Sequence, residues 1–178
     1  ADDIRQALGD GIGQINAEST PEVAAISAIA AEMGLVAPVA LRVNVDVNPG
    51  THAKISTGQR DTKFGISTDQ CEAADLYRKL TEDAHIRPAG LAVHIGSQIR
   101  NLAPFETAYS ALLALAIDLR DAGMPVPNLD LGGGVGVDYD MAGPTDFTAY
   151  GAMVERLFKD QGFTLGFEPW RSIIANNG

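Results

Sequence analysis

The stretch Asp130-Leu131-Gly132-Gly133-Gly134-Val135-Gly136 places four glycines in five positions, directly after a short apolar run. Glycines let a loop bring bare backbone N–H groups close to a bulky group, and phosphate is the usual one. A tight turn between a strand and a helix is the alternative interpretation of the same residues. The dinucleotide fingerprint G-x-G-x-x-G is not met, since its last position holds Val137 or Tyr139.

The composition of the chain narrows the class of protein. Its 178 residues, 46% of them hydrophobic, suffice for a folded globular domain. The formal net charge is −10 and Lys and Arg form no cluster, which argues against a nucleic-acid partner. No apolar run approaches the ~20 residues of a membrane span, so no membrane partner is expected either. The single cysteine, Cys71, cannot form an internal disulfide, and a cytoplasmic location is the expectation.

Strand-like and helix-like segments alternate along the chain about five times. This alternation predicts a parallel sheet with right-handed crossovers, either doubly wound or closed as a (β/α)₈ barrel. We expect a partial (β/α)₈ barrel of about five β-α units with parallel strands, because so few strands cannot close one. Strands are expected over residues 12–17, 39–47, 89–95, 128–131 and 163–167, with a strand-like run at 173–174, and helices over 2–9, 19–33, 67–84, 104–120 and 146–160.

Polar or glycine-rich residues follow the expected strands at their carboxyl ends. Active sites of barrel enzymes gather at that end, so we expect these residues to lie together. A polar residue within a buried strand needs a reason, and for Arg42 one candidate reason is an ion pair inside the barrel or at an interface. The residues at the strand ends are Asp46, Asn48, His94, Ser97, Gly132–Gly136, Glu168 and Arg171.

Several chemistries are open to these residues when each is taken alone. His94 could be a hydrogen-bonded histidine at a strand end rather than a functional one. Glu168 could be a general base, a metal ligand or the anionic partner of a cationic ring, and Arg171 could bind a phosphate or a carboxylate. Neither the ligand spacing of a zinc site nor the G-x-S-x-G motif of a serine nucleophile occurs, so no metal site is expected.

Three motifs occur in a fixed order: His94-Ile95-Gly96-Ser97-Gln98, then Leu129–Gly134, then Glu168-Pro169-Trp170-Arg171-Ser172. Together they resemble the pyridoxal-phosphate enzymes of the alanine-racemase fold type, and among these the group IV decarboxylases. The amino-acid sequence of residues 42–44, 51–58 and 63–65 is similar to that of the diaminopimelate decarboxylase family. The resemblance spans nearly the whole chain.

The resemblance implies pyridoxal 5'-phosphate as cofactor and an amino acid as substrate. The implied reaction is decarboxylation of meso-2,6-diaminopimelate to L-lysine. A related decarboxylase acting on arginine or ornithine, and a non-catalytic pyridoxal-phosphate-binding barrel, are the alternatives. In such a protein residues 1–178 would be part of a single barrel domain, and the full-length parent would be a homodimer.

The resemblance also implies a role for each candidate residue. Glu168 would keep the ring nitrogen of the cofactor protonated, and His94 would stack on the ring face, so these two are the expected catalytic residues. Arg171 is also a candidate for binding a carboxylate of the substrate. The expected cofactor-binding residues, several of them through their backbone around the phosphate, are His94, Ser97, Gly133, Gly134, Glu168, Trp170 and Arg171.

Two features depart from the family pattern. Trp170 stands where the family motif has glycine, and a bulky indole there is expected to block or reshape the phosphate site. The lysine that binds the cofactor covalently in this family lies on an early strand, and the lysines of this chain do not match it: Lys54, Lys63, Lys79 and Lys159. The early barrel strands and the C-terminal β domain are expected to be absent from this chain, which alone should not catalyse decarboxylation.

Overall fold

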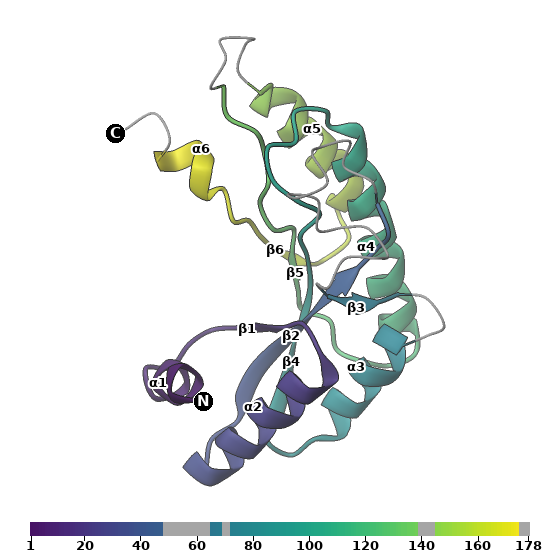
Figure 1. The fold of residues 1–178 in the computed structure, drawn as a ribbon. Helices are drawn as coiled ribbons and strands as arrows, with labels where there is room; N and C mark the ends of the chain where they lie inside the picture. The colour runs from purple at the N-terminus through teal and green to yellow at the C-terminus, as the bar shows by residue number, and fades with distance from the viewer. Residues whose placement is uncertain (48–64, 69–71, 139–144, 175–178) are drawn as a thin grey trace.

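The computed structural model describes residues 1–47, 65–68, 72–138 and 145–174 (Figure 1). Asn48, Cys71 and nearly all of the residues 51–58 and 63–65 that carried part of the resemblance lie outside the described residues. The helices are α1 Asp2–Gly9, α2 Thr20–Met33, α3 Glu72–Glu82, α4 Ala103–Asp121, α5 Phe147–Phe158 and α6 Trp170–Ile174. The strands are β1 Ile15–Ala17, β2 Ala37–Asn44, β3 Ile66–Ser67, β4 Ile86–Val93, β5 Asn128–Asp130 and β6 Thr164–Gly166.

All strand pairs are parallel, and the sheet order is β1-β2-β4-β5-β6. The short strand β3 pairs with the carboxyl end of β2, where Val43 lies opposite Ile66. A doubly wound sheet reverses its strand order at a switch point, whereas the five strands of this path follow the chain without a reversal. The order is that of a barrel wall, and the prediction of a partial (β/α)₈ barrel is confirmed.

Helices α2 to α5 follow one another along one side of the curved sheet, and α1 and α6 lie near its two ends (Figure 1). Strand β2 is buried on both faces, since the successive residues Ala40 and Leu41 are both fully covered, as expected for the interior of a parallel sheet. Helix α4 packs on β4 through a buried face that includes Phe105, Leu112 and Leu119. The core therefore lies between the helices and the sheet, and the strand ends remain available for a site.

The helix expected over residues 19–33 is confirmed as α2, and capping residues fix both of its ends. The Ser19 hydroxyl accepts a hydrogen bond from the backbone N–H of Glu22 at 3.3 Å, and Gly34 ends the helix with a φ of 65°. The strand-like assignment of residues 173–174 is wrong, because they belong to helix α6. Its first turn follows Pro169, whose carbonyl accepts from the N–H of Ile173 at 3.2 Å, and proline favours a helix start.

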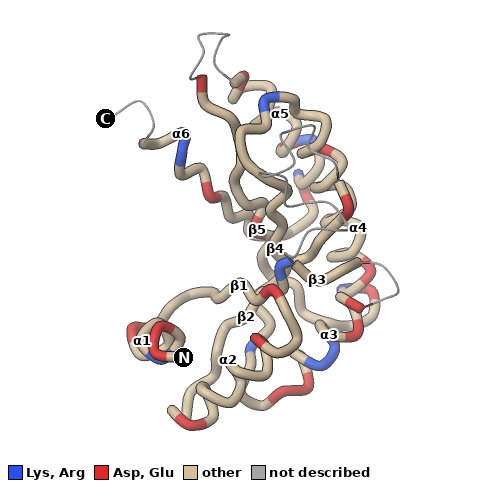
Figure 2. Tube along the Cα trace, viewed as in Figure 1, with Lys and Arg blue, Asp and Glu red and all other residues tan. Residues whose placement is uncertain are grey.

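Acidic and basic residues are dispersed over the described elements (Figure 2).

The predicted strands agree with the observed ones to within a few residues, the first being shorter than expected at Ile15–Ala17. Strand β3 was not predicted, since it has only two residues and forms only because β2 is beside it. Within the described residues, no helix is long and apolar enough to cross a bilayer.

Candidate functional site

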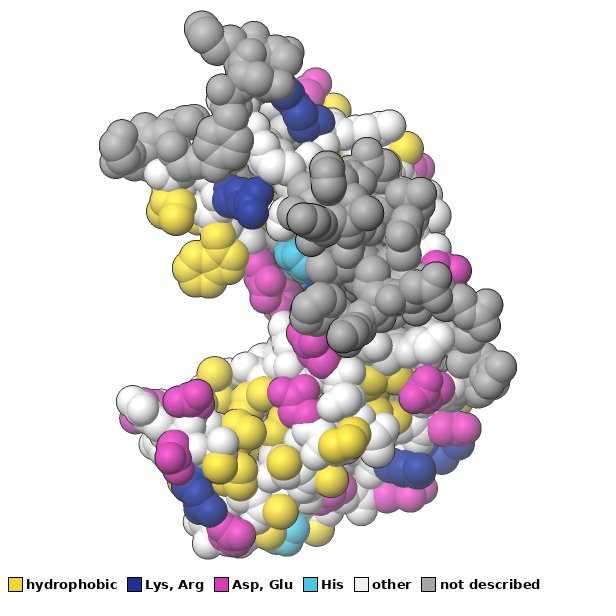
Figure 3. Space-filling view, in the orientation of Figure 1, with side chains coloured by type: hydrophobic (Ala, Val, Ile, Leu, Met, Phe, Trp, Pro, Cys, Tyr) yellow, Lys and Arg dark blue, Asp and Glu magenta, His cyan; other side chains and the backbone are white. Residues whose placement is uncertain are grey.

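Two adjoining cavities lie at the carboxyl ends of the strands, and both are lined by His94 and Glu168. The larger has a volume of about 250 Å³, and its polar lining comes from Asn16, Glu18, Arg42, His94, Asp130 and Glu168. The smaller has a volume of about 110 Å³ and is lined by His94, Ser97, Gly134, Val135, Glu168, Pro169, Trp170 and Arg171. In the space-filling view the molecule is hollowed on this side, with acidic side chains and a histidine on the inner wall (Figure 3).

The smaller cavity gathers most of the residues singled out in the sequence. Of the seven expected cofactor-binding residues, six line it, and the seventh, Gly133, is the neighbour of Gly134. The structure thus brings these residues together from the ends of β4, β5 and β6. Asp46 does not line either cavity; its N–H donates instead to the Asn44 side chain at 3.1 Å.

The glycine loop after β5 is threaded between two neighbouring segments. A Cβ added at Gly133 would lie 2.3 Å from the carbonyl oxygen of Glu168, and one at Gly134 would lie 2.1 Å from that of Gly96. Both distances are far below a van der Waals contact. Glycine is therefore needed at these positions because neighbouring backbone segments of the protein itself pass so close. Neither interpretation of the sequence, a phosphate-binding loop or a tight turn, included this reason.

Backbone hydrogen bonds fix the course of this loop. The Gly132 N–H donates to Asp130 Oδ1 at 2.9 Å, and the Gly132 carbonyl accepts from the Glu168 N–H at 2.8 Å. The Gly133 N–H donates to His94 Nδ1 at 3.3 Å. The loop thereby connects His94 to Glu168, the two residues shared by the cavities. The Gly133 N–H is thus directed to the imidazole and not to the smaller cavity's other residues. Its contact with a phosphate stays a prediction.

His94 follows β4 directly and is half-buried. Burial lowers the pKa of its imidazole, and the positive charge of Arg42 lowers it further, while the carboxylates of Asp130 and Glu18 act in the opposite direction. The imidazole is therefore neutral near pH 7. Since Nδ1 accepts the Gly133 N–H, the remaining proton belongs on Nε2.

Glu168 lies beside a second carboxyl group, that of Asp130. Burial raises the pKa of Glu168, and the negative charge of Asp130 and a hydrogen bond with it raise it further, against the opposing charge of Arg42. Asp130 is in turn held by Asn16, whose Nδ2 donates to Asp130 Oδ2 at 2.9 Å. A cation placed against this pair would favour the ionised form of Glu168.

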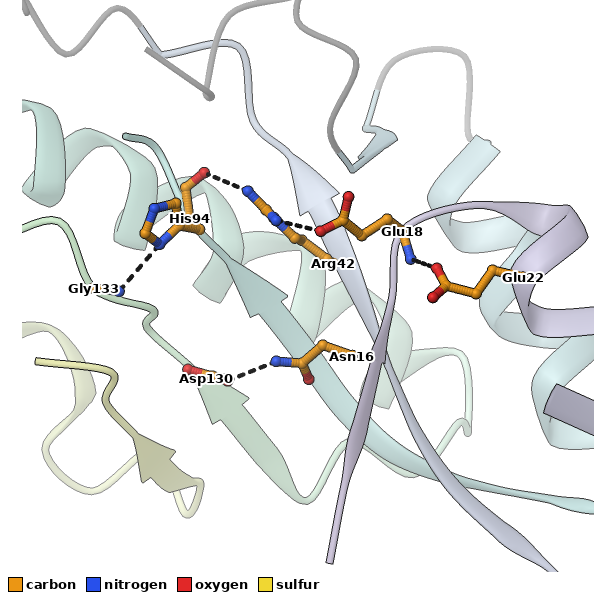
Figure 4. A network of polar contacts seen from close by, with 7 residues as sticks. All are labelled: Asn16, Glu18, Glu22, Arg42, His94, Asp130 and Gly133. Atoms are coloured by element: carbon orange, nitrogen blue, oxygen red, sulfur yellow. Dashed lines mark hydrogen bonds and ion pairs between the residues drawn. The ribbon is translucent and has the colours of Figure 1, made fainter. Parts of the chain in front are cut away.

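Arg42 makes the ion pair that the sequence suggested. Its guanidinium pairs with Glu18, and its Nη2 lies 3.5 Å from the His94 carbonyl oxygen (Figure 4). Sequence reasoning did not single out Glu18, Asn16 or Asp130 as site residues. Asp130 opens the glycine stretch, which was a usable signal, but Asn16 and Glu18 resemble ordinary polar residues around a short strand.

Trp170 lines the smaller cavity, although its side chain is 73% exposed. Its φ is not among the positive values of the described residues, so the backbone here does not require glycine. If Trp170 blocks or reshapes the phosphate site, it does so through the bulk of its indole at the cavity and not through its backbone conformation. In a full-length version we expect Trp170→Gly to tighten pyridoxal-phosphate binding, measured by cofactor absorbance during titration. Unchanged or weaker affinity would count against this.

The charges of the two cavities suit a ligand with unlike ends. Arg171 and the Ser97 hydroxyl offer a cation and a donor to an anion in the smaller cavity. The larger cavity is lined by the carboxylates of Glu18, Asp130 and Glu168, and His94 and Glu168 line both cavities. No cluster of three or more His, Cys, Asp or Glu side chains that could hold a metal occurs among the residues described.

Comparisons with known proteins agree with this arrangement. The family model "pyridoxal-dependent decarboxylase, pyridoxal binding domain" matches residues 1–175. Diaminopimelate decarboxylase of Zymomonas mobilis is 46% identical over 180 residues, covering 100% of this chain and 42% of that protein. The Pseudomonas aeruginosa enzyme of the same name is 43% identical over 177 residues, covering 99% and 42%.

A solved structure is similar over nearly the same range. The crystal structure of Helicobacter pylori diaminopimelate decarboxylase complexed with L-lysine has a TM-score of 0.91 and 32% identity, covering 97% of this chain and 43% of that one. The chain spans 42% of the length of the two curated relatives. Because the family model matches nearly every residue, the chain belongs to the family of pyridoxal-dependent decarboxylases, through their pyridoxal binding domain.

Proposed function

We propose that this chain is the cofactor-binding part of a pyridoxal-phosphate-dependent carboxy-lyase that converts meso-2,6-diaminopimelate to L-lysine. The observation that carries the proposal is the position of His94 and Glu168, which line both cavities, between the carboxylate-rich larger cavity and the smaller cavity that holds Arg171 and Ser97. The names of the relatives from Zymomonas mobilis and Pseudomonas aeruginosa support the substrate. The L-lysine bound to the Helicobacter pylori enzyme supports the product. No observation favours arginine or ornithine as substrate.

The residues of the site fit pyridoxal 5'-phosphate by the chemistry of their donors. Arg171 and Ser97 would hold the phosphate in the smaller cavity, where a guanidinium and a hydroxyl make charge-assisted hydrogen bonds with an anion. Glu168 would face the ring nitrogen, and His94 would lie along the ring between these two ends. When bound, the cofactor supplies a sink for the electrons left by departing CO₂.

Each residue has a separate task in this scheme. Glu168, with Asp130 beside it, would hold a proton at the ring nitrogen, since two adjacent carboxyl groups favour a neighbouring cation. His94 would keep the ring in place through its neutral imidazole, because a charged one would repel a protonated ring. Arg171 would also be a candidate for binding a substrate carboxylate.

We further propose the setting of this site in the whole protein. Residues 1–178 would be part of a single (β/α)₈ barrel domain, completed by strands that precede it and followed by a β domain. The coverage of 42% of each relative supports a larger protein. A homodimer in the cytoplasm is the proposed state; the location is supported by the single cysteine, Cys71, which cannot form a disulfide within this chain.

Cofactor binding can be measured on the chain itself. Trp170 is the only tryptophan and lines the smaller cavity, so its fluorescence reports on a ligand there. We expect pyridoxal 5'-phosphate to quench this fluorescence saturably, and pyridoxal without phosphate to bind more weakly. Arg171→Gln should weaken binding of the phosphorylated form roughly tenfold or more, since it removes a charged hydrogen-bond donor.

Surface lysines can react with the cofactor anywhere, so a matched control is needed. Arg156→Gln removes a guanidinium from the exposed α5–α4 ion pair with Glu106 and should leave the titration unchanged. Equal quenching by both variants, or none by the wild type, would argue against the site.

The substrate is tested on the full-length protein, where CO₂ release is expected from meso-diaminopimelate and not from arginine or ornithine. The 178-residue chain alone should release none.

A further inference from the structure

Arg42 joins the ends of three neighbouring strands. It lies on β2, which stands between β1 and β4 in the sheet. Its guanidinium pairs with Glu18, directly after β1, and Nη2 lies 3.5 Å from the carbonyl oxygen of His94, directly after β4 (Figure 4). We propose that Arg42 is a positioning residue, which holds His94 and, through it, the Gly133 end of the glycine loop in place for the cofactor.

The Glu18 side of this contact is itself fixed by the first turn of α2. The Glu18 N–H donates to Glu22 Oε2 at 2.7 Å, and the Glu22 N–H donates to the Ser19 hydroxyl at 3.3 Å. The chain after β1 therefore cannot move independently of the helix. Arg42 carries this rigidity across β2 to the end of β4.

The His94 side continues the connection to the glycine loop. Arg42 reaches the backbone of His94, and the His94 side chain accepts the Gly133 N–H at 3.3 Å. The imidazole can accept this bond only while Nδ1 carries no proton. A positive charge close to His94 opposes its protonation, so Arg42 acts on both the place and the charge state of the ring.

The ion pair has little reason to be present for stability alone. The Arg42 and Glu18 side chains are 17% and 35% exposed, so both charges have lost much of their hydration. Partly buried ion pairs gain little net stability once this loss is counted. The Arg42–Glu18 pair is better explained by positioning, because a planar guanidinium binds two oxygens in fixed directions.

The charges that face His94 come from several elements. Arg42 on β2 lowers the pKa of His94, whereas Glu18 after β1 and Asp130 on β5 raise it. Glu168 and Arg171 line the same cavities. The two halves of one ion pair therefore act on His94 in opposite directions. This opposition gives a test that general damage to the fold cannot reproduce.

The test is an NMR titration of the chain with labelled histidine and no cofactor, which does not depend on the proposed function. The chain has three histidines, and the His94 signal is identified by its loss in His94→Gln. The wild type should show Nδ1 unprotonated and a midpoint below the usual value of a histidine. Arg42→Gln should raise the midpoint, and Glu18→Gln should lower it.

Control variants separate this role from a general effect of charge. Arg78→Gln removes a guanidinium from the exposed Arg78–Asp75 pair on α3 and should leave the midpoint unchanged. Arg42→Lys keeps the charge, so the midpoint should stay lowered. Shifts of the same sign in Arg42→Gln and Glu18→Gln, or no shift in either, would overturn the proposal. If Arg42→Gln does not fold, the direction in Glu18→Gln decides.

The link to the cofactor rests on the proposed function and is measured second. Arg42→Lys should weaken pyridoxal-phosphate binding about tenfold, the equivalent of one lost hydrogen bond, because an ammonium lacks the planar fork. Wild-type affinity in this variant would overturn the positioning role. Failure of the wild type to bind would instead contradict the proposed function, with the histidine titration unaffected.

Discussion

Gly132→Ala is expected to lower the free energy of unfolding of the chain by about 2–5 kcal/mol. The φ of Gly132 is +66°, a left-handed conformation that costs an alanine about 1–2 kcal/mol. A Cβ there would also lie 2.1 Å from the carbonyl oxygen of Val93, which is backbone of β4 and cannot rotate away. Forcing this contact open adds about 1–3 kcal/mol. Urea unfolding monitored by circular dichroism measures the sum.

Two other glycines separate these contributions. Gly11 has a similar φ of +75° but nothing within 4 Å of the added Cβ, so Gly11→Ala should show the conformational cost alone. Gly151 lies inside α5, again with nothing within 4 Å, and Gly151→Ala should stabilise the chain by about 0.5–1 kcal/mol. Equal losses in Gly132→Ala and Gly11→Ala would show that the loop after β5 is not confined by β4.

The sequence contained enough to predict the architecture and the meeting place of the site. Alternating segments predicted parallel strands, and parallel strands bring their carboxyl ends to one edge. His94, Gly134 and Glu168 therefore had to approach one another, although the first and the last are 74 positions apart in the chain. The roles given to these residues came from a resemblance, and their contacts with the cofactor stay predictions.

Other parts of the site depended on contacts that no local pattern encodes. Glu18 is polar, follows a strand of three residues and matters only because Arg42 reaches it across the sheet. Asp130 affects Glu168 because the loop after β5 passes beside the end of β6. The helix at 170–174 was missed for another reason: its five residues carry too little periodicity to show a helix.

Glu168→Gln is expected to reduce decarboxylation by the full-length protein roughly 10²- to 10³-fold, the usual loss for one preorganised electrostatic group. The amide has nearly the same size as the carboxylate and can occupy the same place, so cofactor affinity should fall much less. What the variant would lose is the negative charge that, in the proposed scheme, holds a proton at the ring nitrogen. The measurement is the turnover number for CO₂ release at saturating substrate. Glu155→Gln, in an exposed ion pair on α5, is the matched control and should keep full activity.

Asp130→Asn distinguishes this role from a merely structural one. Asp130 raises the pKa of Glu168 by its charge and its hydrogen bond, so the neutral amide should lower that pKa. If the ionised form of Glu168 supports the reaction, the acidic limb of the pH–rate profile must then move to lower pH, whatever happens to the maximal rate. An acidic limb that stays in place in Asp130→Asn, or a Glu168→Gln variant that keeps most of its activity, would assign the proton at the ring to another group. Both results together would leave Glu168 as a residue that only shapes the wall between the two cavities.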